Sequence, residues 1–413
     1  MLYYSIPIMN IQKYSEKHIV IAGAGFAGIQ TVLELLERDI HGSITLINNS
    51  PYFTYYPGLH KILSDQNRGI SQIALSDLFS DRRVTIIVDD IVGVDSVSKT
   101  VTLKNSAAVT GDILVLALGG ETEYYNTPGL REHSYSMKSY PDALHLRRHI
   151  VEIFESYSTG EKTHNIGSLC INIVGGGPLG VDTAGELALW TNKLAKLFRV
   201  PKKLVSINLI DSSKRLLPML SESAAEKVLK RLTNLGIRVM LEKRIMNESG
   251  DGLCLSDIKI DTDTVIWTAG VRANSLYEKI TGLIVVGNKK RIQVDDFLCA
   301  TPSDDYHIND VYIAGDGAEA AYSGLAQTAI AHGEYIGKSI IKKLQGVPVL
   351  PYDHKSVAYH IGVGHGWAVM KLGRITLYGF FAHIMRTFID LRYFLSILSF
   401  KKVWELYHKK KEL

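Results

Sequence analysis

The chain has 413 residues, of which 46% are hydrophobic and 21% charged, and its formal net charge is +4 at pH 7. This length and composition fit a folded protein of two or three domains and exclude a disordered chain. The modest charge, without a basic stripe, gives no reason to expect a nucleic-acid partner. The three cysteines contain no C-x-x-C pair, so we expect no disulfide framework, no metal site and no dithiol relay.

The first residues, 1–17, have neither a basic start nor a long apolar run, so we expect a short extension rather than a secretory signal. No window of about 18 residues is both apolar and free of charge. The sequence therefore predicts no membrane-spanning helix.

A strand, a glycine turn and a helix are predicted next. Residues 19–22 form a short apolar run, and IAGAGFAG supplies a G-x-G-x-x-G pattern through Gly23, Gly25 and Gly28 before an amphipathic segment. In that context the first glycine permits the tight turn, the second lets the backbone approach a pyrophosphate, and the third lets helix and strand pack closely. We therefore predict a dinucleotide site here.

The following strand, 44–50, should end in an acid that binds ribose hydroxyls. Asn48 stands at that position. An amide hydrogen-bonds a ribose more weakly than a carboxylate does, so Asn48 departs from the pattern. Residues 84–95 and 99–103 then alternate like antiparallel strands, and 112–120 is predicted as a buried strand that ends in glycine.

The middle of the chain repeats this order. A helix is predicted over 141–157, and VGGGPLGVDTAGE follows an apolar strand with Gly175, Gly177 and Gly180 in its turn. Later segments, KIDTDTVIWTAGV and DVYIAGDGA, are predicted as strands that end in glycine turns. Such alternation of strands and helices, duplicated along the chain, predicts an α/β fold with two Rossmann-like dinucleotide-binding domains and mostly parallel sheets.

The acid expected after the second strand of this repeat is present as Asp211. A carboxylate there binds ribose hydroxyls and repels a 2′-phosphate, which favours NAD over NADP. Lys214 and Arg215 lie close by in the sequence and leave NADP as the less favoured alternative.

The C-terminal segment LYGFFAHIMRTFIDLRYFLSILSFKKVWELYHKKKEL is predicted as an amphipathic helix. Its apolar stripe has an alternating four-and-three spacing and consists of Leu377, Phe381, Ile384, Phe388, Leu391, Leu395 and Leu398. Charged residues interrupt any spanning segment, namely Arg386, Asp390 and Arg392. The aromatic content and the lysines at the end favour a helix lying at a membrane surface of anionic lipid. A helix packed on the protein's own core, or a dimer contact, is the alternative.

Together these residues resemble the type II NADH dehydrogenases, which are single-subunit NADH:quinone oxidoreductases with FAD. The resemblance covers nearly the whole chain after about residue 17. It is carried, in order, by LVLALGGETEYYNTPGL, MKSYPDALHLRRHI, IVGGGPLGVDTAGELA, DSSKRLLP, TVIWTAGVRAN, VYIAGDGA and LAQTAIAHGEYIGKSI. It implies a glutathione-reductase-like arrangement with a discontinuous FAD-binding domain at 18–135 and 286–345, an NADH-binding domain at 136–285 and a membrane-associating region at 346–413.

The resemblance also implies two sets of cofactor-binding residues. For FAD these are Gly23, Gly25, Phe26, Ala27, Gly28, Asn48, Ile91, Leu118, Gly119, Asp316 and Gln327. For NADH they are Gly175, Gly177, Pro178, Leu179, Gly180, Asp211, Ala269 and Gly270.

Two residues are implied in catalysis. The family has an acid, usually Glu, inside the helix of the NADH domain, and Asp182 stands there, where it would handle a proton as quinone becomes quinol. The alternative is that Asp182 caps the helix N-terminus. Glu186 lies on the same helical face and is a weaker candidate. The family's Ala-Gln motif matches Gln327, and its basic residue in the C-terminal part matches His365 only loosely.

The resemblance implies that NADH passes a hydride to FAD and that two electrons then reach a membrane quinone without proton pumping. The protein would be peripheral on the cytoplasmic side of the cell membrane, and a homodimer is also implied as a partner state. One alternative is a sulfide:quinone reductase, which needs reactive cysteines near the flavin, such as Cys170 or Cys299. Another is a redox-responsive NADH-binding protein of the apoptosis-inducing-factor type.

Overall fold

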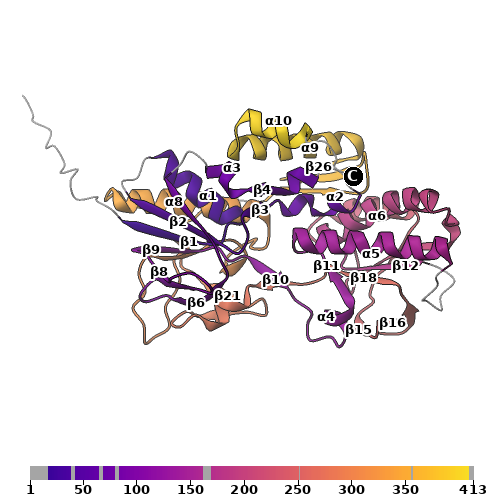
Figure 1. The fold of residues 1–413 in the computed structure, drawn as a ribbon, viewed down its shortest axis with the longest axis horizontal. Coiled ribbons are helices and arrows are strands. Elements are labelled where there is room, and N and C mark those ends of the chain that lie inside the picture. The colour runs from indigo at the N-terminus through magenta and orange to yellow at the C-terminus, as the bar shows by residue number, and fades with distance from the viewer. Residues whose placement is uncertain are drawn as a thin grey trace, which may run out of the picture. The chain divides into compact units, whose positions relative to one another are not determined.

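A computed structural model describes residues 17–38, 42–64, 68–79, 83–160, 169–250, 252–354 and 357–408. By its internal contacts the chain divides into two compact units. Figure 1 shows the fold, with the ribbon coloured by residue number. Unit 1 comprises Met1–Phe53, Ala74–Gly120 and Arg272–Lys355, and unit 2 comprises Thr54–Ile73, Glu121–Val271 and Ser356–Leu413. The chain changes unit five times, and four of these changes fall within short strands, β3 (Tyr52–Thr54), β4 (Gln72–Ala74), β10 (Gly120–Thr122) and β19 (Val271–Ala273).

These unit boundaries differ from the domain boundaries predicted at residues 135 and 285. Unit 2 takes in a short N-terminal piece, 54–73, and the whole C-terminal region. The prediction concerned which segments bind which nucleotide, and that assignment stays a prediction.

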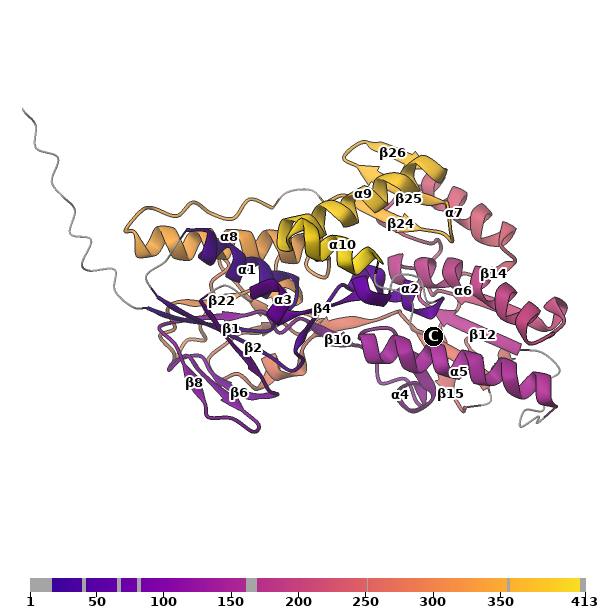
Figure 2. The same ribbon diagram turned by 45° about the horizontal axis from the view of Figure 1, so that its top comes forward.

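Unit 1 is built on a five-stranded sheet in which every neighbouring pair is parallel. In spatial order its strands are β22 (Val311–Ile313), β9 (Ile113–Leu116), β1 (His18–Ala22), β2 (Ser43–Asn48) and β5 (Val84–Val88). Helix α1 (Phe26–Glu37) packs on α8 (Ala326–Leu344), and both figures show the two side by side (Figures 1 and 2). A three-stranded antiparallel sheet follows, with β6 (Ile91–Asp95), β7 (Thr100–Leu103) and β8 (Val109–Thr110).

Unit 2 repeats this plan. Its parallel sheet has the order β11 (Ser134–Ser136), β18 (Thr264–Trp267), β12 (Leu169–Val174), β13 (Val205–Ile210) and β14 (Ile237–Met240). Its antiparallel sheet consists of β15 (Ile245–Glu248), β16 (Gly252–Leu255) and β17 (Lys259–Asp261). The helices of this part are α4 (Leu130–His133), α5 (Tyr140–Thr159), α6 (Pro178–Leu197) and α7 (Glu222–Asn234).

The two sheets correspond strand by strand. In each, the central strand (β1 or β12) leads into a glycine turn and a helix. The next two strands of the sheet, β2 and β5 or β13 and β14, extend it on one side, and β9 or β18 lies on the other side. The far edge differs, because β22 comes from late in the chain whereas β11 precedes its own glycine turn. The predicted α/β fold with duplicated, mostly parallel sheets is confirmed.

Two strand predictions were wrong in detail. Residues 84–95 are not one antiparallel partner, because β5 pairs in parallel with β2 and only β6 pairs antiparallel with β7. The segment 259–271 is not one strand but two, β17 and β18. The chain turns between them at Asp263, whose carboxylate accepts a hydrogen bond from the backbone N–H of Cys170 at 2.8 Å. Short apolar runs indicate a strand but not its pairing partner. The periodicity of apolar residues could therefore predict neither the pairing of β5 nor the break between β17 and β18.

The C-terminal region forms a small antiparallel sheet and two helices, and not one helix as predicted. The strands are β24 (Tyr359–Gly362), β25 (Ala368–Leu372) and β26 (Ile375–Tyr378), followed by α9 (Gly379–Ile397) and α10 (Phe400–His408). Leu377 lies on β26, and Leu398 is extended between the helices. Ser399 directly precedes α10, and its carbonyl accepts a hydrogen bond from the backbone N–H of Val403 at 3.0 Å.

The remaining helical segments of the described chain are short. They are α2 (Leu59–Leu63), α3 (Leu75–Phe79) and the 3-10 turns at Tyr56–Gly58, Arg68–Ser71, Lys202–Leu204, Ser275–Lys279 and Gly315–Gly317. Each unit has its own apolar core, and that of unit 2 extends from the sheet across α2, α5, α6 and β24. Three further short strands, β20 (Val285–Val286), β21 (Arg291–Gln293) and β23 (Ala318–Glu319), form a separate sheet in unit 1.

One buried acid in unit 2 should make stability depend on pH. Glu248 ends β15, and one of its carboxylate oxygens has no hydrogen-bond partner in the described chain. Burial raises the pKa of this carboxyl from 4.5 to about 7. The folded state then binds a proton that the unfolded state releases, so stability falls as pH rises from about 4.5 to 7.

We predict that Glu248→Gln removes this dependence, because an amide needs no proton to stay neutral. Above pH 7 the variant should be more stable than the unsubstituted protein by about 1–3 kcal/mol. Urea unfolding followed across this pH range measures the difference. Parallel pH curves for the two proteins would contradict the prediction.

Candidate active site

The glycine turn of unit 1 has the geometry that its three glycines predict. Gly23 has a φ of +107°, and a Cβ there would lie 2.2 Å from the carbonyl oxygen of Ala117. A Cβ on Gly28 would lie 1.9 Å from the Gly23 oxygen, so only glycine lets α1 approach the turn this closely. A Cβ on Gly25, the residue that precedes α1, would meet nothing within 4 Å. Gly25 therefore borders open space at the helix N-terminus, where a phosphate is favoured.

The turn of unit 2 repeats these three roles. Gly175 has a φ of +120°, and a Cβ on Gly180 would lie 1.8 Å from the Gly175 oxygen. A Cβ on Gly177, directly before α6, would again meet nothing within 4 Å. Pro178 and Leu179 then open the helix. The duplication therefore extends from strand order to the individual glycines.

Asn48 and Asp211 end corresponding strands and close the two turns in the same way. The Asn48 side-chain oxygen accepts from the backbone N–H of Ala24 at 3.0 Å, and the Asp211 carboxylate accepts from the backbone N–H of Gly176. The other ends of the two side chains differ. Nδ2 of Asn48 donates to the carbonyl of Ser50 at 2.8 Å, whereas Oδ1 of Asp211 accepts from the N–H of Ser213 at 2.6 Å.

This difference explains the missing acid in unit 1. The loop after β2 presents a carbonyl oxygen, which needs a donor, and the loop after β13 presents an N–H, which needs an acceptor. Asn48 therefore closes its turn with a side-chain oxygen as Asp211 does, and the departure from the ribose-binding pattern reflects loop polarity.

The other residues expected at FAD lie in unit 1. Leu118 and Gly119 follow β9, and Gly119 has a φ of +69°. The side chain of Tyr277 contacts this segment. Its hydroxyl donates to the Leu116 carbonyl at 3.2 Å and accepts from the Leu118 N–H at 3.3 Å. A Cβ on Gly317, next to Asp316, would lie 2.3 Å from that hydroxyl. Tyr277 thus joins two predicted flavin segments, and no sequence motif marked it.

The turn that contains Asp316 is fixed from α8. The backbone N–H of Gly315 donates to Nδ1 of His332 at 3.2 Å. Burial lowers the pKa of His332 to about 4, so the ring is a neutral acceptor at physiological pH. Gln327 is the second residue of α8, half-buried, and Ile91 begins β6. Phe26 and Ala27 are buried in α1, where Phe26 packs edge-on against Phe53.

The residues of unit 1 fit a flavin dinucleotide. The open space at Gly25 suits a pyrophosphate, as described above. The hydroxyls of Ser323, three residues before α8, and of Thr328, in its first turn, are buried and have no hydrogen-bond partner among the described residues. Buried polar atoms are normally paired, so such atoms mark where a ligand or water binds.

The residues expected at NADH lie together in unit 2. Ala269 and Gly270 follow β18, and a Cβ on Gly270 would lie 2.3 Å from the carbonyl oxygen of Glu123. Arg215, which left NADP open as an alternative, donates its guanidinium to the carbonyls of Leu220 and Pro218 at 2.9 and 2.8 Å. The guanidinium of Arg215 therefore braces its own loop, which favours NADH.

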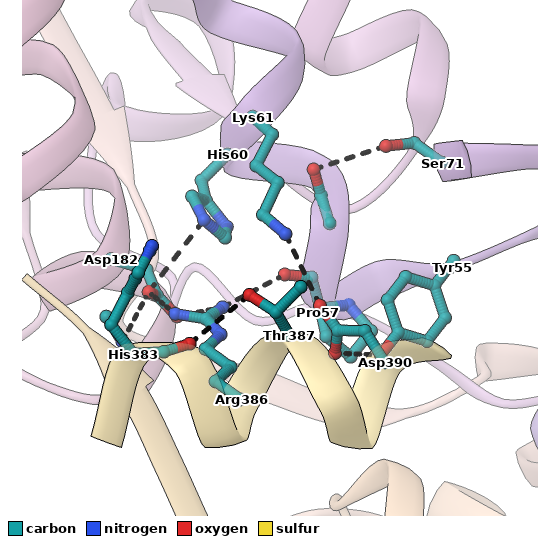
Figure 3. A network of polar contacts seen from close by, with 12 residues as sticks. Tyr55, Pro57, His60, Lys61, Ser71, Asp182, His383, Arg386, Thr387 and Asp390 are labelled. Atoms are coloured by element: carbon teal, nitrogen blue, oxygen red, sulfur yellow. Dashed lines mark hydrogen bonds and ion pairs between the residues drawn. The ribbon is translucent and has the colours of Figure 1, made fainter. Parts of the chain in front are cut away.

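Asp182 makes a buried ion pair, which Figure 3 shows in detail. Its two carboxylate oxygens accept from the guanidinium of Arg386 on α9, at 2.6 and 3.3 Å. One of them also accepts from the backbone N–H of Gly362 on β24 at 2.8 Å. The N-cap of α6 is Gly177, and Asp182 makes no capping bond to its own helix. The alternative that Asp182 serves as a helix cap is therefore wrong.

Opposing effects act on the proton affinity of Asp182. Burial is the largest, and it raises the pKa of the carboxyl above its usual value. The charge and hydrogen bonds of Arg386 and the N–H of Gly362 lower the pKa. Asp182 is therefore a buried acid that can exchange a proton beside a permanent positive charge.

A second buried carboxylate, that of Asp390, lies on α9 one helical turn after Arg386. Asp390 accepts from the hydroxyl of Tyr55 at 2.7 Å and pairs with Lys61 on α2 at 3.3 Å. Burial alone would raise the pKa of Asp390, but Lys61, Arg386 and Tyr55 together lower it. Arg386 also donates to the carbonyl of Pro57 at 3.4 Å (Figure 3).

The buried face of α9 carries two charged residues among apolar ones, which include Ile397. Arg386 and Asp390 point inward with Ala382 and Phe394, whereas Phe381 and Phe388 of the predicted apolar stripe are each 60% exposed. Other exposed apolar side chains on α9 and α10 are those of Phe380, Leu395, Phe400 and Trp404.

Arg386, which pairs with Asp182, is a basic residue that the sequence analysis did not single out for the site. His365, the loose match, is exposed and lies against His383 with ring centroids 5.5 Å apart. The signal was the pair Arg386 and Asp390, four residues apart on the side of the helix opposite the apolar stripe. Charges placed on that face are either solvated or buried as pairs, and the sequence alone does not distinguish these cases.

The cysteines do not have the properties of flavin-reducing thiols. Burial raises the pKa of Cys299 to about 12 and raises that of Cys170 as well. Cys299 pairs with Tyr312 of β22 in an isolated bridge, and the charges of Asp295, Lys343 and Asp310 act on it. A thiol with a raised pKa is a poor nucleophile, so these residues do not favour the sulfide:quinone alternative.

Comparison with known proteins agrees with this architecture. A family model described as pyridine nucleotide-disulphide oxidoreductase matches residues 17–333. The chain belongs to this family.

Two curated relatives are named type II NADH:quinone oxidoreductase. That of Staphylococcus haemolyticus is 28% identical over 412 residues, covering 94% of this chain and 98% of that protein. That of Staphylococcus aureus is 28% identical over 411 residues with the same coverage. The resemblance to type II NADH dehydrogenases is therefore confirmed.

Solved structures share the fold. NDH2 from Plasmodium falciparum in complex with NADH has a TM-score of 0.84 at 18% identity, over 95% of this chain and 97% of that one. The sulfide:quinone oxidoreductase of Aquifex aeolicus has a TM-score of 0.76 at 18% identity, over 96% of both chains. Within the described part of this chain, no helix has the length and apolar character needed to cross a bilayer.

The loop polarity at Asn48 leads to a prediction. In Asn48→Asp a carboxylate oxygen would face the Ser50 carbonyl, and this repulsion should cost about 1–3 kcal/mol. We expect the melting temperature to fall by about 2–8 °C and the protein to retain less flavin after gel filtration. Asp211→Asn is the matched control for the second turn. An Asn48→Asp protein with unchanged melting and higher flavin content would show that the loop does not select the amide.

Proposed function

We propose that the chain oxidises NADH and reduces a quinone, with FAD as its resident cofactor and without proton pumping. The observation that carries this proposal is the helix α6. It begins at a glycine turn suited to a nucleotide, and it carries Asp182, a buried acid able to exchange a proton, in its second turn. The relatives named type II NADH:quinone oxidoreductase support the same reaction.

The two units divide the binding work in this proposal. FAD is held in unit 1 by the turn around Gly25, with Asn48 closing that turn and Asp316 and Gln327 contributing from the second flavin motif and α8. NADH is held in unit 2 by the turn around Gly177, with Asp211 selecting its ribose. When bound, FAD supplies a carrier that accepts two electrons from NADH and gives them to quinone.

Asp182 handles a proton in this reaction. Reduction of a quinone to a quinol needs two protons as well as two electrons, and a buried carboxyl is suited to deliver one of them. Arg386 keeps the deprotonated form from being a lone buried charge, because its guanidinium binds both carboxylate oxygens. The shorter side chain of Asp, where the family usually has Glu, is accommodated by these contacts.

The C-terminal helices supply the route to a membrane quinone. With Arg386 and Asp390 buried on the inward face of α9, aromatic side chains lie outward on α9 and α10. With the lysines that follow in the sequence, this outward face suits the interface of an anionic lipid surface. We place the protein peripherally on the cytoplasmic side of the cell membrane, with NADH and a membrane quinone as partners and a homodimer as its assembly.

The deciding experiment measures NADH oxidation by the flavin-loaded protein on lipid vesicles, with and without a soluble quinone. The proposal requires that quinone accelerate NADH oxidation. Bound flavin that NADH reduces but quinone does not reoxidise would instead support a redox-responsive binding protein.

We predict that Asp182→Asn lowers quinone turnover about 100-fold while leaving the reduction of bound flavin by NADH unchanged. The amide cannot donate the carboxyl proton, and it leaves the charge of Arg386 unpaired. The double variant Asp182→Asn with Arg386→Met removes both charges and so separates the proton effect from instability. Stopped-flow absorbance follows both half-reactions. Quinone turnover in the double variant equal to that of the unsubstituted protein would refute the proton role.

A second prediction concerns the membrane. Replacing exposed Phe388 on α9 by Ser should weaken binding to anionic vesicles about tenfold, because a buried Phe contributes about 1.5–3 kcal/mol. Leu197→Ser, at the exposed end of α6, is the control and should leave binding unchanged. Vesicle co-sedimentation gives both affinities. Equal losses for the two variants would contradict docking through α9.

A further inference from the structure

Residues 124–127 of unit 2 form a tight turn with an unusual backbone. The backbone N–H of Thr127 donates to the carbonyl of Tyr124 at 3.0 Å, and the two residues between them, Tyr125 and Asn126, both have a φ of +52°. A turn with positive φ at both central positions is of type I′, and these positions are normally occupied by Gly, Asn or Asp. Asn126 follows this preference, whereas Tyr125 places a bulky side chain on a left-handed backbone, which strains it. Strain of this kind marks positions that serve a function.

The turn presents the ring of Tyr125 instead of burying it. The Glu123 carboxylate accepts from the backbone N–H of Tyr125 at 2.7 Å, which holds the start of the turn. Trp267, at the end of β18, is 5% exposed and donates its indole N–H to the Glu123 carbonyl at 2.8 Å. Tyr125 meets this indole edge-on, with ring centroids 6.5 Å apart. It is nevertheless 62% exposed, more than any other tyrosine of the described residues, so packing on Trp267 does not account for its placement.

Tyr125 lies at the edge of the sheet where a dinucleotide is expected. β13 and β14 lie on one side of β12 and β18 lies on the other, so the strand order reverses between β12 and β18. Sheets of this kind bind their ligands at such a point, outside the carboxyl ends of the strands. The two carboxyl ends meet here, since a Cβ on Gly175 would lie 2.9 Å from the Cα of Ala269. Tyr125 borders the same place, because a Cβ on Gly270 would lie 3.0 Å from Cε2 of its ring.

The glycine turn and Asp211 determine which end of the nucleotide reaches Tyr125. The pyrophosphate is expected at Gly177, before α6, and Asp211 binds the adenosine ribose at the end of β13. β13 and β18 flank β12 on opposite sides. The nicotinamide half therefore runs from the pyrophosphate across the end of β18, past Gly270 and toward Tyr125.

We propose that Tyr125 binds the pyridine nucleotide by stacking its ring on the nicotinamide. This inference rests on the proposed function and adds a residue that recognises the reacting half of NADH. An aromatic ring stacked on a planar base changes affinity by about tenfold or more. The oxidised nicotinamide is a cation, which the face of a tyrosine ring also attracts. Because the turn already holds the ring at the rim of the site, little conformational freedom is lost when the nucleotide binds.

Two ligands that differ in one group test the proposal. NAD⁺ and ADP-ribose share the adenosine, the pyrophosphate and the second ribose, and only NAD⁺ has the nicotinamide. Calorimetry measures the binding of each to the flavin-loaded full chain. We expect Tyr125→Ala to weaken NAD⁺ binding about tenfold and to change ADP-ribose binding by less than about twofold. Tyr125→Phe, which keeps the ring, should retain both affinities.

Tyr306→Ala is the matched control. Tyr306 is also an exposed tyrosine, but it lies in unit 1, outside both glycine turns. Its replacement should leave both affinities unchanged.

The reduction of bound flavin by NADH gives a second readout. In stopped flow, Tyr125→Ala should need about tenfold more NADH to reach half of its maximal rate of flavin reduction. Reoxidation of the reduced flavin by quinone should stay unchanged, which shows that the fold is retained. A loss in both half-reactions would assign Tyr125 to the fold of unit 2 and overturn the proposal.

The remaining outcomes are equally decisive. If ADP-ribose affinity falls as far as NAD⁺ affinity, Tyr125 does not act on the nicotinamide, and the proposal is wrong. Unchanged NAD⁺ binding in Tyr125→Ala, or an equal loss in Tyr125→Phe, also overturns it. These results leave the proposed function intact, whereas failure of NADH to reduce the flavin of the unsubstituted chain rejects the proposed function itself.

Discussion

The ion pair between Asp182 and Arg386 determines how the C-terminal region of unit 2 is built. Two charges removed from water are tolerated only when they are paired closely and their remaining hydrogen bonds are satisfied. Arg386 reaches both oxygens of Asp182 and also the Pro57 carbonyl, and Gly362 completes the carboxylate. A Cβ on Gly362 would lie 2.2 Å from the guanidinium, so this strand can pass the pair only with glycine at that position.

The orientation of α9 follows from this pair. Because Arg386 and Asp390 must face inward to find their partners, the aromatic residues on the other side of the helix face outward. The buried side of α9 is therefore mixed, because these two charges lie beside the buried apolar residues Ala382, Phe394 and Ile397. One set of buried charges therefore accounts both for the acid that would exchange protons and for the apolar surface that would meet lipid. A variant that neutralises the pair should affect both.

Sequence patterns predicted what depends on short segments of the chain. The roles of Gly23, Gly25 and Gly28 follow from a turn between a strand and a helix, and the same logic held for the second turn. What failed depended on partners distant in sequence. The pairing of β5 and the burial of Arg386 are each decided by residues far along the chain, and apolar periodicity does not record them. The predicted cofactor assignments and the role of Gln327 stay predictions.

Asn48 and Asp211 show how a residue can depart from a local sequence motif and still form the structure that the motif describes. Read as a motif, the first turn lacks its acid and should bind a ribose poorly. The hydrogen bonds show otherwise, because an oxygen of each side chain closes its turn. The other end of Asn48 donates to a carbonyl of the following loop, and the other end of Asp211 accepts from an N–H of its loop. The residue type at this position therefore depends on two neighbours, the ribose and the loop. A sequence motif that requires an acid for the ribose will reject a glycine turn when the loop after the second strand presents a carbonyl oxygen. The glycine turn itself is equally well formed in that case.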